Sequence, residues 1–521
     1  MSGPILTMDF ETDPFEYGLN PRPFACGLYN GQDFESIWSP KCATQMLERL
    51  KSLPPAVIYM HNGGKFDIFF ILESLEADML IINGRVVSAH IGHHEVRDSF
   101  SIIPVALSQY KKDDIDIKKL HKDSRASNRV EILSYLRGDC VYLHELVTAF
   151  HAEFGDKMTI GSAAMQQLKR FHPYKTINSR IDARFRQDFF RGGRVQVFQA
   201  GVLKKNFKIL DENSMYPDAM KNFKHPNAAN FDVDNKVTKD TAFIIAEGRN
   251  YGALAVRKDN GGLDFTRESG RFNCTIHEWR AALDTEMFKP ARVVKTFSCR
   301  EWISFDGFVD HFFAGRVKAK SEGNKILDLF YKLILNSAYG KFAQNPDSFC
   351  DHCITHGEHP GEGWEPRYSH GNGTFVIWQK PKGMITGGFA QGYYNVAIGA
   401  SITGAGRSKL MRGIHNATDL IYCDTDSLIC GDLPGVELSD TELGAWKLEG
   451  QGDSIAVAGK KMYACFDGDE CIKKATKGAR LTPEEIVMVA NGGMVRYQNP
   501  APNFKLNGQV KFIERGIRRT V

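Results

Sequence analysis

Short apolar runs that end at acidic residues recur along this chain. Apolar residues on both sides of Asp424-Thr425-Asp426 predict two short strands joined by a turn, with two carboxylates at its tip. Carboxylates between buried strands need a partner, and a divalent metal ion is the partner that such a pair favours. Residues 207–210 predict another strand, which ends at Asp211. We therefore expect Asp211 and Asp426 to form a site for two metal ions, the arrangement used for attack at phosphorus.

The first third of the chain carries a second set of acidic residues. Residues 4–10 predict a strand on which Asp9 and Glu11, two positions apart, point to the same face. Residues 57–60 predict a buried strand, followed by a turn and by a helix whose first turn holds Asp67. Taken alone, an Asp-x-Glu pair is more often a solvated strand edge than a metal site.

A helix over residues 131–150 supplies the last acid of this set. Its periodicity places Tyr135 and Asp139 on one face, four positions apart. That face would present a carboxylate to a metal ion and a phenol to an attacking water. An ordinary surface pair is the alternative, but four acids that each end an apolar element are the ingredients of a two-metal nuclease.

A third pattern of polar positions lies on a predicted helix over residues 321–339. Lys332, Asn336 and Tyr339 share one face of this helix, and apolar residues occupy another. The polar face would place an ammonium on a triphosphate, an amide nearby and a ring against a base. For Lys332 alone a solvated surface position is the better interpretation, because most helix lysines are solvated.

Six motifs in this sequence resemble those of a known family. Asp-x-Glu, Asn-x-x-x-Phe-Asp and Tyr-x-x-x-Asp resemble the three exonuclease motifs of proofreading DNA polymerases. Asp-x-x-Ser-Met-Tyr-Pro, Lys-x-x-x-Asn-Ser-x-Tyr-Gly and Tyr-Cys-Asp-Thr-Asp-Ser resemble the three polymerase motifs of family B. The six motifs occur in the family's order and cover most of the chain.

The resemblance implies a multidomain α/β and α+β fold. An RNase H-like 3′–5′ exonuclease domain would precede a right-hand polymerase of palm, fingers and thumb. Insertions are expected at about 218–315 and 345–385. The expected domain limits are 1–150 for the exonuclease, 151–200 for a linker with a Phe-Arg-Gly-Gly segment, 201–470 for palm and fingers, and 471–521 for the thumb.

The resemblance also assigns roles in DNA synthesis. Asp211 and Asp426 would hold the two metal ions, with Asp424 in a supporting position. Tyr216 would lie beneath the incoming sugar and exclude a 2′-hydroxyl, and Lys332 would clamp the nucleotide. The chemistry is attack of a primer 3′-oxygen on the α-phosphorus of a deoxynucleoside triphosphate. The residues expected to bind the nucleotide are Tyr216, Lys318, Lys332, Asn336 and Tyr339.

The exonuclease site is assigned in the same way. Asp9, Glu11, Asp67 and Asp139 would be its metal ligands, and Tyr135 would orient the attacking water. Mg²⁺ is the expected ion, two per active site, with Mn²⁺ as the alternative.

Shorter matches to the family predict contacts with a DNA primer-template. Phe190-Arg191-Gly192-Gly193 resembles a Tyr-x-Gly-Gly segment, with Phe in place of Tyr, so a hydrogen bond from that phenol is absent. Phe100 stands after Ser99, where the family usually has Leu. The residues expected to contact DNA are Asn62, Phe66, Ser99, Lys112, Arg191, Gly192, Gly193, Thr403, Arg407, Lys461 and Tyr463.

Composition and charge change this picture little. Lys and Arg number 66 and Asp and Glu 62, so a net charge of +4 permits basic tracks beside acidic metal sites. The 11 cysteines are scattered and odd in number, and the sequence shows neither an apolar leader nor a membrane-length run. We expect a monomer with free thiols that does not enter a membrane and acts in the cytoplasm, that of a host cell if a phage encodes it.

Two features resemble one branch of the family, the compact protein-primed polymerases of phages and linear plasmids. Asp9 stands almost at the first residue, and a Gly- and His-rich insertion follows the Lys332 motif. The first insertion would then contact a priming terminal protein, and the second would encircle DNA and support strand displacement. A primer-independent relative is the alternative.

One cluster of potential metal ligands lies outside the six motifs. Cys350, Cys353, His356 and His359 are spaced three apart, which is cramped compared with ordinary zinc modules. A loop is the preferred interpretation.

Two other functions compete with a polymerase. A non-catalytic DNA-binding protein on a decayed polymerase scaffold is disfavoured, because every acidic residue expected at the two metal sites is present. An enzyme that works only as a nuclease is disfavoured by the intact polymerase motifs.

Overall fold

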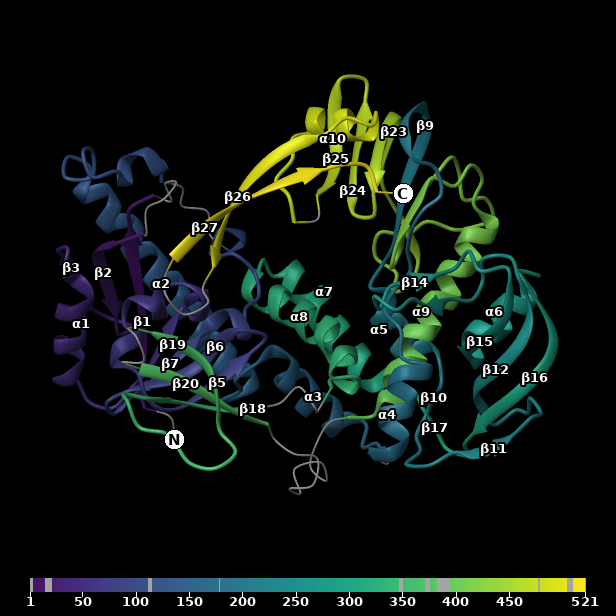
Figure 1. Cartoon of the computed structure of the whole chain (residues 1–521), viewed down its shortest axis with the longest axis horizontal. Coiled ribbons are helices and arrows are strands. Elements are labelled where there is room, and N and C mark those ends of the chain that lie inside the picture. Colours follow the sequence, from purple (N-terminus) through teal and green to yellow (C-terminus); the bar gives the residue numbers. More distant parts are fainter. Residues whose placement is uncertain are drawn as a thin grey trace.

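The protein was analysed as a computed structural model, which describes residues 3–14, 21–110, 115–177, 179–345, 350–370, 375–381, 394–476, 478–503 and 509–520. Two large sheets lie at opposite sides of a helical middle, and a smaller sheet extends from one of them (Figure 1). No helix in these ranges is both long and apolar enough to cross a bilayer.

The N-terminal domain is built on a mixed sheet in the order β19-β20-β18-β5-β6-β7-β4-β1-β2-β3. Its centre is parallel, with β4 between β1 and β7, and its other pairings are antiparallel. The strands are β1 (Ile5–Thr12), β2 (Pro23–Tyr29), β3 (Phe34–Trp38), β4 (Val57–Met60), β5 (Glu76–Ile82), β6 (Arg85–Ile91), β7 (His94–Asp98), β18 (Cys350–Thr355), β19 (Glu365–His370) and β20 (Phe375–Pro381).

Helices cover this sheet and position its acids. The predicted helix over 131–150 is confirmed as α2 (Arg129–Phe154), and α1 (Cys42–Lys51) packs against β2 and β3. The predicted helix at Asp67 is instead a 3₁₀ turn, η2 (Asp67–Phe70). The other short turns are η1 (Gly63–Lys65), η3 (Leu72–Ser74), η4 (Ser99–Ser101), η5 (Leu107–Gln109) and η6 (Ile117–Leu120).

The second insertion corrects the loop interpretation, because its described residues form β18, β19 and β20 on the N-terminal sheet. Strand β18 pairs with β5, with Cys353 opposite Asp78. Cys350 and Cys353 are three positions apart on one strand, so their side chains leave opposite faces of the sheet. Among the described residues no three His, Cys, Asp or Glu side chains are already arranged around a metal position, and Cys350, Cys353, His356 and His359 are therefore not assembled as a four-ligand zinc cluster.

Helices fill the space between the two large sheets. Ring centroids of Phe150 on α2 and Phe330 lie 5.6 Å apart, and those of Phe154 and Phe312 lie 6.4 Å apart, so one aromatic core joins the N-terminal domain to these helices. The stretch 151–200 contains two helices of its own. The helices here are α3 (Ile160–Phe171), α4 (Ser179–Asp188), α7 (Asp306–Ser321) and α8 (Lys325–Phe342).

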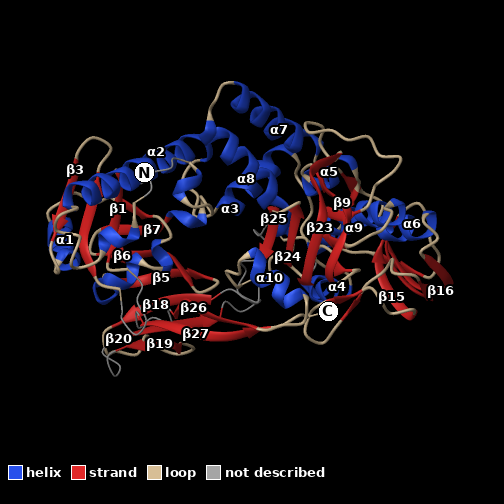
Figure 2. Cartoon of the chain, turned by 90° about the horizontal axis from the view of Figure 1, so that it is seen from above, coloured by secondary structure: helices blue, strands red, loops and turns tan. Residues whose placement is uncertain are grey.

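The second large sheet is antiparallel, in the order β25-β24-β23-β9-β22-β21-β8. The predicted strands before Asp211 and around the acidic turn are confirmed as β9, β21 and β22. Helices α5 (Met215–Asn222) and α9 (Val396–Asn416) connect this sheet to the helical middle: α5 packs on α7 and α8, and α9 packs on α8 and β22. Both lie close to β9 in Figure 2. The strands are β8 (Val195–Val197), β9 (Gly201–Glu212), β21 (Tyr422–Asp424), β22 (Ser427–Cys430), β23 (Trp446–Gly459), β24 (Met462–Asp467) and β25 (Glu470–Thr476).

The first insertion forms a smaller sheet in the order β11-β16-β12-β15, covered by α6 (Ile276–Asp284). Its strands are β11 (Asp232–Asp234), β12 (Thr241–Asn250), β15 (Ser269–Thr275) and β16 (Phe288–Ser298). The short pairs β10 (His225–Pro226) with β17 (Trp302–Ile303), and β13 (Val256–Arg257) with β14 (Leu263–Asp264), complete the region.

The C-terminal segment contains α10 (Pro483–Ala490) and a hairpin of β26 (Val495–Asn503) and β27 (Gln509–Ile517). The hairpin runs from the β23–β25 side of the molecule towards the N-terminal domain (Figure 1).

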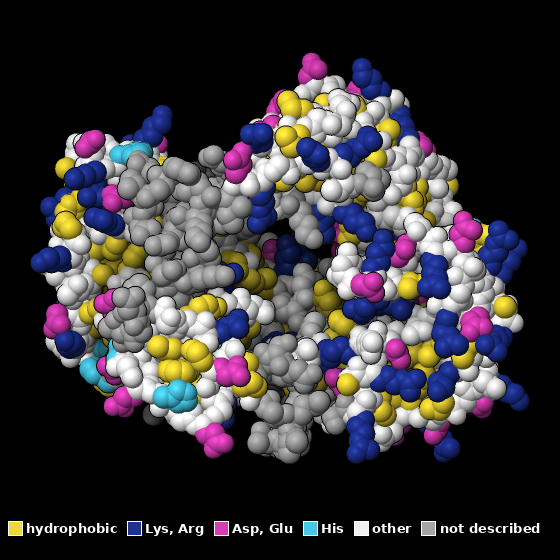
Figure 3. All heavy atoms as spheres, viewed as in Figure 1, with side chains coloured by type: hydrophobic (Ala, Val, Ile, Leu, Met, Phe, Trp, Pro, Cys, Tyr) yellow, Lys and Arg dark blue, Asp and Glu magenta, His cyan; other side chains and the backbone are white. Residues whose placement is uncertain are grey.

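The face seen in Figure 3 is hollowed near its centre, with Lys and Arg side chains on the walls of the hollow.

Candidate active sites

The acidic turn and the end of β9 meet through strand pairing. Ser427 on β22 lies opposite Asp211 on β9, which brings Asp211 beside the turn that holds Asp424 and Asp426. The Glu212 amide donates a hydrogen bond of 2.8 Å to the Asp426 carbonyl. The expected proximity of Asp211 and Asp426 therefore follows from the register of one antiparallel pair.

A cavity of ≈ 680 Å³ lies in front of these carboxylates. It unites the three polymerase motifs, which are far apart in the sequence. The lining residues are Asp211, Glu212, Asn213, Ser214, Met215, Tyr216, Pro217, Arg316, Lys332, Asn336, Tyr339, Asp424, Thr425, Asp426, Ser427, Lys461 and Tyr463.

The surroundings of the two carboxylates expected to hold metal ions disfavour their charged forms. Burial, followed by repulsion from Asp426, raises the pKa of Asp211 to about 7. Burial is also the main cause that raises the pKa of Asp426 to about 6, and Asp424 adds repulsion. A divalent cation between Asp211 and Asp426 would offset this repulsion. It would also stabilise the charged carboxylates in place of the water that burial removes. The donor set therefore fits Mg²⁺.

Asp424 is in a different position from its neighbour. The Lys461 ammonium donates to both of its carboxylate oxygens, at 2.8 and 2.7 Å. A side chain of the protein thus already neutralises Asp424, which fits the supporting position expected for it. The Lys461 amide also donates to the Tyr422 hydroxyl at 2.9 Å, and the ring of Tyr463 lies 5.1 Å from that of Tyr422.

Residues of α5, α7 and α8 form another wall of the cavity. The rings of Tyr216 and Tyr339 are stacked, with centroids 4.1 Å apart. Lys332 and Asn336 are exposed on α8 and line the cavity beside them.

On α7 the side chain of Lys318 lies away from the cavity, and its contact with a nucleotide stays a prediction. Lys318 does not line the cavity; its side chain is 75% exposed, with the ammonium 3.9 Å from Glu322 Oε1. Arg316 lines the cavity instead, held by Asp328 at 2.8 Å. Two positions along an α-helix turn the side chain by about 200°, so Arg316 and Lys318 leave the helix on nearly opposite sides. Sequence reasoning missed Arg316, although it stands in the same basic run.

A buried ionic group beneath the cavity was also missed. The Lys409 ammonium on α9 contacts both Glu212 and Asp218, and it donates to the Gly444 carbonyl at 3.1 Å. Burial is the main cause that raises the pKa of Glu212 to about 7. This group ties β9, α5 and α9 together next to Asp211, and only the adjacency of Glu212 to Asp211 pointed to it in the sequence.

The Phe-Arg-Gly-Gly segment packs directly on the acidic turn. A Cβ atom on Gly193 would lie 2.5 Å from Thr425 Oγ1, so only glycine fits there. The Thr425 amide donates to the Arg194 carbonyl at 2.7 Å. Thr425 itself has a φ of 60°, a conformation that L-residues other than Asn and Asp seldom adopt. The segment therefore fixes the conformation of the turn that carries Asp424 and Asp426.

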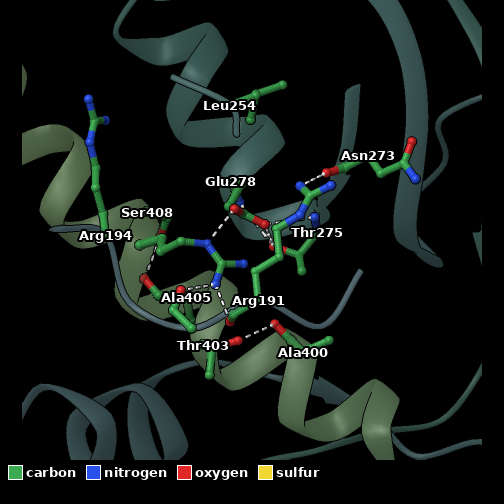
Figure 4. A network of polar contacts seen from close by, with 12 residues as sticks. Arg191, Arg194, Leu254, Asn273, Thr275, Glu278, Ala400, Thr403, Ala405 and Ser408 are labelled. Carbon is green, nitrogen blue, oxygen red and sulfur yellow. Dashed lines mark hydrogen bonds and ion pairs between the residues drawn. The ribbon is translucent and has the colours of Figure 1, made fainter. Parts of the chain in front are cut away.

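Arg191, Thr403 and Arg407 are buried, contrary to the exposure that direct DNA contact would need. Figure 4 shows Arg191 and Thr403 near Glu278 in a network of polar contacts. Arg407 pairs with Glu278 at 2.7 Å and donates to the carbonyls of Arg191 and Gly192 at 2.6 and 2.8 Å. The Arg407 side chain thus holds the backbone of the Phe-Arg-Gly-Gly segment in place. Contact of Arg191, Thr403 and Arg407 with DNA stays a prediction.

The exonuclease acids are brought together from three elements: β1 carries Asp9 and Glu11, η2 begins at Asp67, and α2 carries Asp139. Burial raises the pKa of Asp9 well above its usual range, and repulsion from the other three acids adds to the shift. Burial, then Asp139 and Asp67, raises the pKa of Glu11 to about 8. Burial raises the pKa of Asp67 to about 7. All four groups thus share one electrostatic environment.

These acids fit a divalent cation on chemical grounds. Glu11 Oε1 and Asp67 Oδ1 are buried and have no hydrogen-bond partner among the described residues. Tyr135, one turn before Asp139 on α2, has its pKa raised by burial and then by Asp139. Buried carboxylate oxygens without donors are the ligands that Mg²⁺ or Mn²⁺ prefers.

The predicted DNA contacts of this domain differ in their surroundings. Asn62 has a φ of 58° and accepts a hydrogen bond of 2.9 Å from Arg85. Phe66 packs edge-on against Phe70, with ring centroids 5.2 Å apart. Ser99 is fully buried and bonds the His61 ring at 2.9 Å, so it positions other groups rather than facing solvent. Lys112 lies outside the described residues.

Comparisons with known proteins identify the family. The model of DNA polymerase type B, organellar and viral, matches residues 108–419. The chain is 44% identical to the DNA-directed DNA polymerase of Enterobacteria phage PRD1, over 99% of this chain and 98% of that protein. It is 24% identical to the DNA polymerase of Bacillus phage phi29, over 76% of this chain and 75% of that protein.

Solved structures give the same answer for the fold. Phi29 DNA polymerase complexed with primer-template DNA superposes with a TM-score of 0.72 at 19% identity, covering 99% of this chain and all of that one. The predicted exonuclease and right-hand polymerase architecture is thereby confirmed. The chain belongs to the family B DNA polymerases, in the compact protein-primed branch of phages and linear plasmids.

Proposed function

We propose that this chain synthesises DNA on a template at the Asp211–Asp426 cavity and removes nucleotides from the 3′ end of a strand at the Asp9–Asp139 site. The observation that carries this proposal is the single cavity in which two uncompensated carboxylates face Lys332 and a stacked pair of tyrosines. Such a cavity combines the charge needed for phosphoryl transfer with an aromatic surface for a nucleotide.

Each side chain of the synthetic site has a distinct task. Asp211 and Asp426 would hold divalent ions, which lower the pKa of a primer 3′-hydroxyl and stabilise charge on phosphate oxygens when bound. Lys332 and Arg316 orient the triphosphate, and the Tyr216 ring selects the deoxyribose by closing the space beside C2′. Lys461 keeps Asp424 neutralised, so the turn does not repel the incoming phosphates.

The degradative site works with the same chemistry in a separate domain. Asp9, Glu11, Asp67 and Asp139 would hold the ions, and Tyr135 orients a water towards the terminal phosphodiester. Separate sites let the enzyme add and remove nucleotides without sharing a carboxylate.

We further propose that a terminal protein supplies the primer and that the enzyme displaces a strand as it copies. Support comes from the 44% identity to the PRD1 polymerase and from the two insertions. The first forms its own sheet domain beside the synthetic site, and the second extends the N-terminal sheet, towards which the hairpin of the C-terminal segment runs (Figure 1).

The test is extension or shortening of a 5′-labelled primer on a longer template, with Mg²⁺, with and without deoxynucleotides. Asp426→Ala should abolish extension and retain shortening, whereas the double variant Asp9→Ala/Glu11→Ala should do the reverse. Asp432→Ala, which removes an exposed carboxylate paired with Lys208, is the matched control and should leave both activities intact. Loss of both activities in either site variant would refute the two-site assignment, and DNA binding without either activity would favour a binding protein.

A further inference from the structure

A second polar cavity, of ≈ 590 Å³, lies behind the synthetic site. The two cavities occupy opposite ends of α5: Met215 lines the first, and Asn222 lines the second. The eight residues of this helix separate them by about 12 Å. The second cavity lies where α5 and α9 meet α6 and other residues of the first insertion, and these helices are side by side in Figure 1. None of the six motifs contributes to it.

Five cationic side chains line this cavity, and their partners divide them into two groups. Lys409 is held by Glu212 and Asp218, and Arg412 is paired with Asp284. Lys224, Lys239 and Arg280 are exposed and have no ion-pair or side-chain hydrogen-bond partner in the described part of the chain. Their full charge is therefore available to a ligand.

The opposing charge in the cavity is small. Among the described residues, Asp240 is the single acidic residue that lines it, so three unpaired cations face one carboxylate. The ends of the helices near the cavity do not reverse this excess of positive charge. The first turn of α6, at Ile276 and His277, presents backbone N–H groups, whereas α5 ends nearby with its carbonyl dipoles. The Ala219 carbonyl near that end accepts a bond from His225 at 3.0 Å.

The remaining wall is aromatic and apolar. Phe223 is fixed edge-on against His277, with ring centroids 5.1 Å apart, and Ile276 is buried beside it. Trp302 is half-buried, and its indole N–H has no protein partner among the described residues. Unpaired cations opposite an aromatic surface suit a ligand that carries both phosphate and a flat ring.

We propose that this cavity binds a nucleotide, with its phosphates on Lys224, Lys239 and Arg280 and its base against Trp302. The volume lies within the range of pockets for small ligands, about 300–1,000 Å³. Lys409 and Arg412 contribute shape rather than charge, because carboxylates of the protein already hold them. This site is distinct from the one that would bind the substrate nucleotide.

The test is isothermal titration calorimetry of the full chain with ADP, in a chelator that removes divalent ions and so weakens binding at the synthetic site. One molecule of ADP should bind. The double variant Lys224→Ala/Arg280→Ala should bind at least about tenfold more weakly, because charge-assisted hydrogen bonds to phosphate are lost. Both positions are exposed, so an unchanged unfolding temperature verifies that this variant folds.

Lys332→Ala is the matched control, because it removes a cation from the other cavity and should leave ADP affinity unchanged. Absence of binding by the wild-type chain would overturn the proposal, as would loss of binding in Lys332→Ala with retention in the double variant. Inorganic pyrophosphate is the second probe. Equal affinity for pyrophosphate and ADP would overturn the role of Trp302, whereas a clear preference for ADP that Trp302→Ala abolishes would support it.

Discussion

Gly193 is the residue on which the geometry of the synthetic site depends most directly. It lies against Thr425, in the turn between Asp424 and Asp426, and has no room for a side chain. Gly192, one residue earlier, has open space at the same position. The two neighbouring glycines therefore differ: Gly193 permits close packing against Thr425, whereas the position of Gly192 has space for a side chain.

Gly193→Ala should abolish most primer extension and leave shortening intact, because the added methyl group displaces Thr425 and with it Asp424 and Asp426. Gly192→Ala is the matched control and should be nearly neutral. Combining Gly193→Ala with Thr425→Gly should restore part of the extension, since it frees the space and suits the positive φ. Equal loss in both alanine variants would contradict this explanation.

The buried acids of the exonuclease site should destabilise the fold when no metal is bound. The pKa of Glu11 is raised to about 8, so the folded state holds a proton there that the unfolded state has released by about pH 5. Folding stability therefore falls as pH rises through this window.

The double variant Asp9→Asn/Glu11→Gln should accordingly raise the unfolding temperature in EDTA at about pH 8, where it removes the cost of buried charge. The gain should shrink at about pH 5, where Glu11 is already protonated. Scanning calorimetry at both values measures it, and a gain that is larger at the lower pH would contradict the assigned pKa shift.

Among the helices and strands, α2 has a double role that the sequence did not reveal. Its first half presents Tyr135 and Asp139 to the exonuclease site, and its second half packs Phe150 and Phe154 against α7 and α8. The element that carries one active site is thus part of the core that supports the other.

Phe330→Ala should lower the free energy of unfolding by about 3–5 kcal/mol, because it leaves a cavity in this shared core. Both activities should then be lost at the same lower temperature. Val317→Ala, at a position 56% exposed on α7, is the control and should change little. If heating abolished extension and left shortening intact, the shared core would not couple the two domains.

Elements with a strong local pattern were predictable, and those that depend on distant partners were not. The strands before Asp211 and around Asp424 and Asp426 are confirmed because alternating burial and a turn specify them locally. The pairing of β18 with β5 was missed because it joins segments more than 250 residues apart, as their bounds show. Burial of Arg407 was missed for the same reason, since its partner Glu278 belongs to the first insertion.

For the molecule as a whole, the two active sites differ in the environment of their acids. At the exonuclease site burial raises the pKa of Glu11 to about 8, and at the synthetic site it raises the pKa of Asp211 to about 7 and that of Asp426 to about 6. Protons compete with metal ions for the ionised carboxylates, so metal affinity at each site falls as pH drops through these values.

The Mg²⁺ concentration needed for half-maximal shortening should therefore begin to rise below about pH 8, and that for half-maximal extension only below about pH 7. Mg²⁺ titrations of both reactions between about pH 6 and pH 9 measure this difference. The Asp426→Ala variant isolates shortening, and the Asp9→Ala/Glu11→Ala variant isolates extension. Identical pH dependence of the two Mg²⁺ requirements would contradict the electrostatic difference between the sites.

The addition of β18 to β5 has a consequence for how such a protein can change over evolutionary time. Strand β18 covers an edge of β5 that would otherwise expose unpaired backbone groups, and exposed edges of this kind promote association between molecules. A chain that lost the second insertion would keep its exonuclease acids but would expose a sheet edge that can pair with other molecules. The insertion and the nuclease sheet are therefore expected to be inherited, lost or transplanted together, although more than 250 residues of sequence separate them.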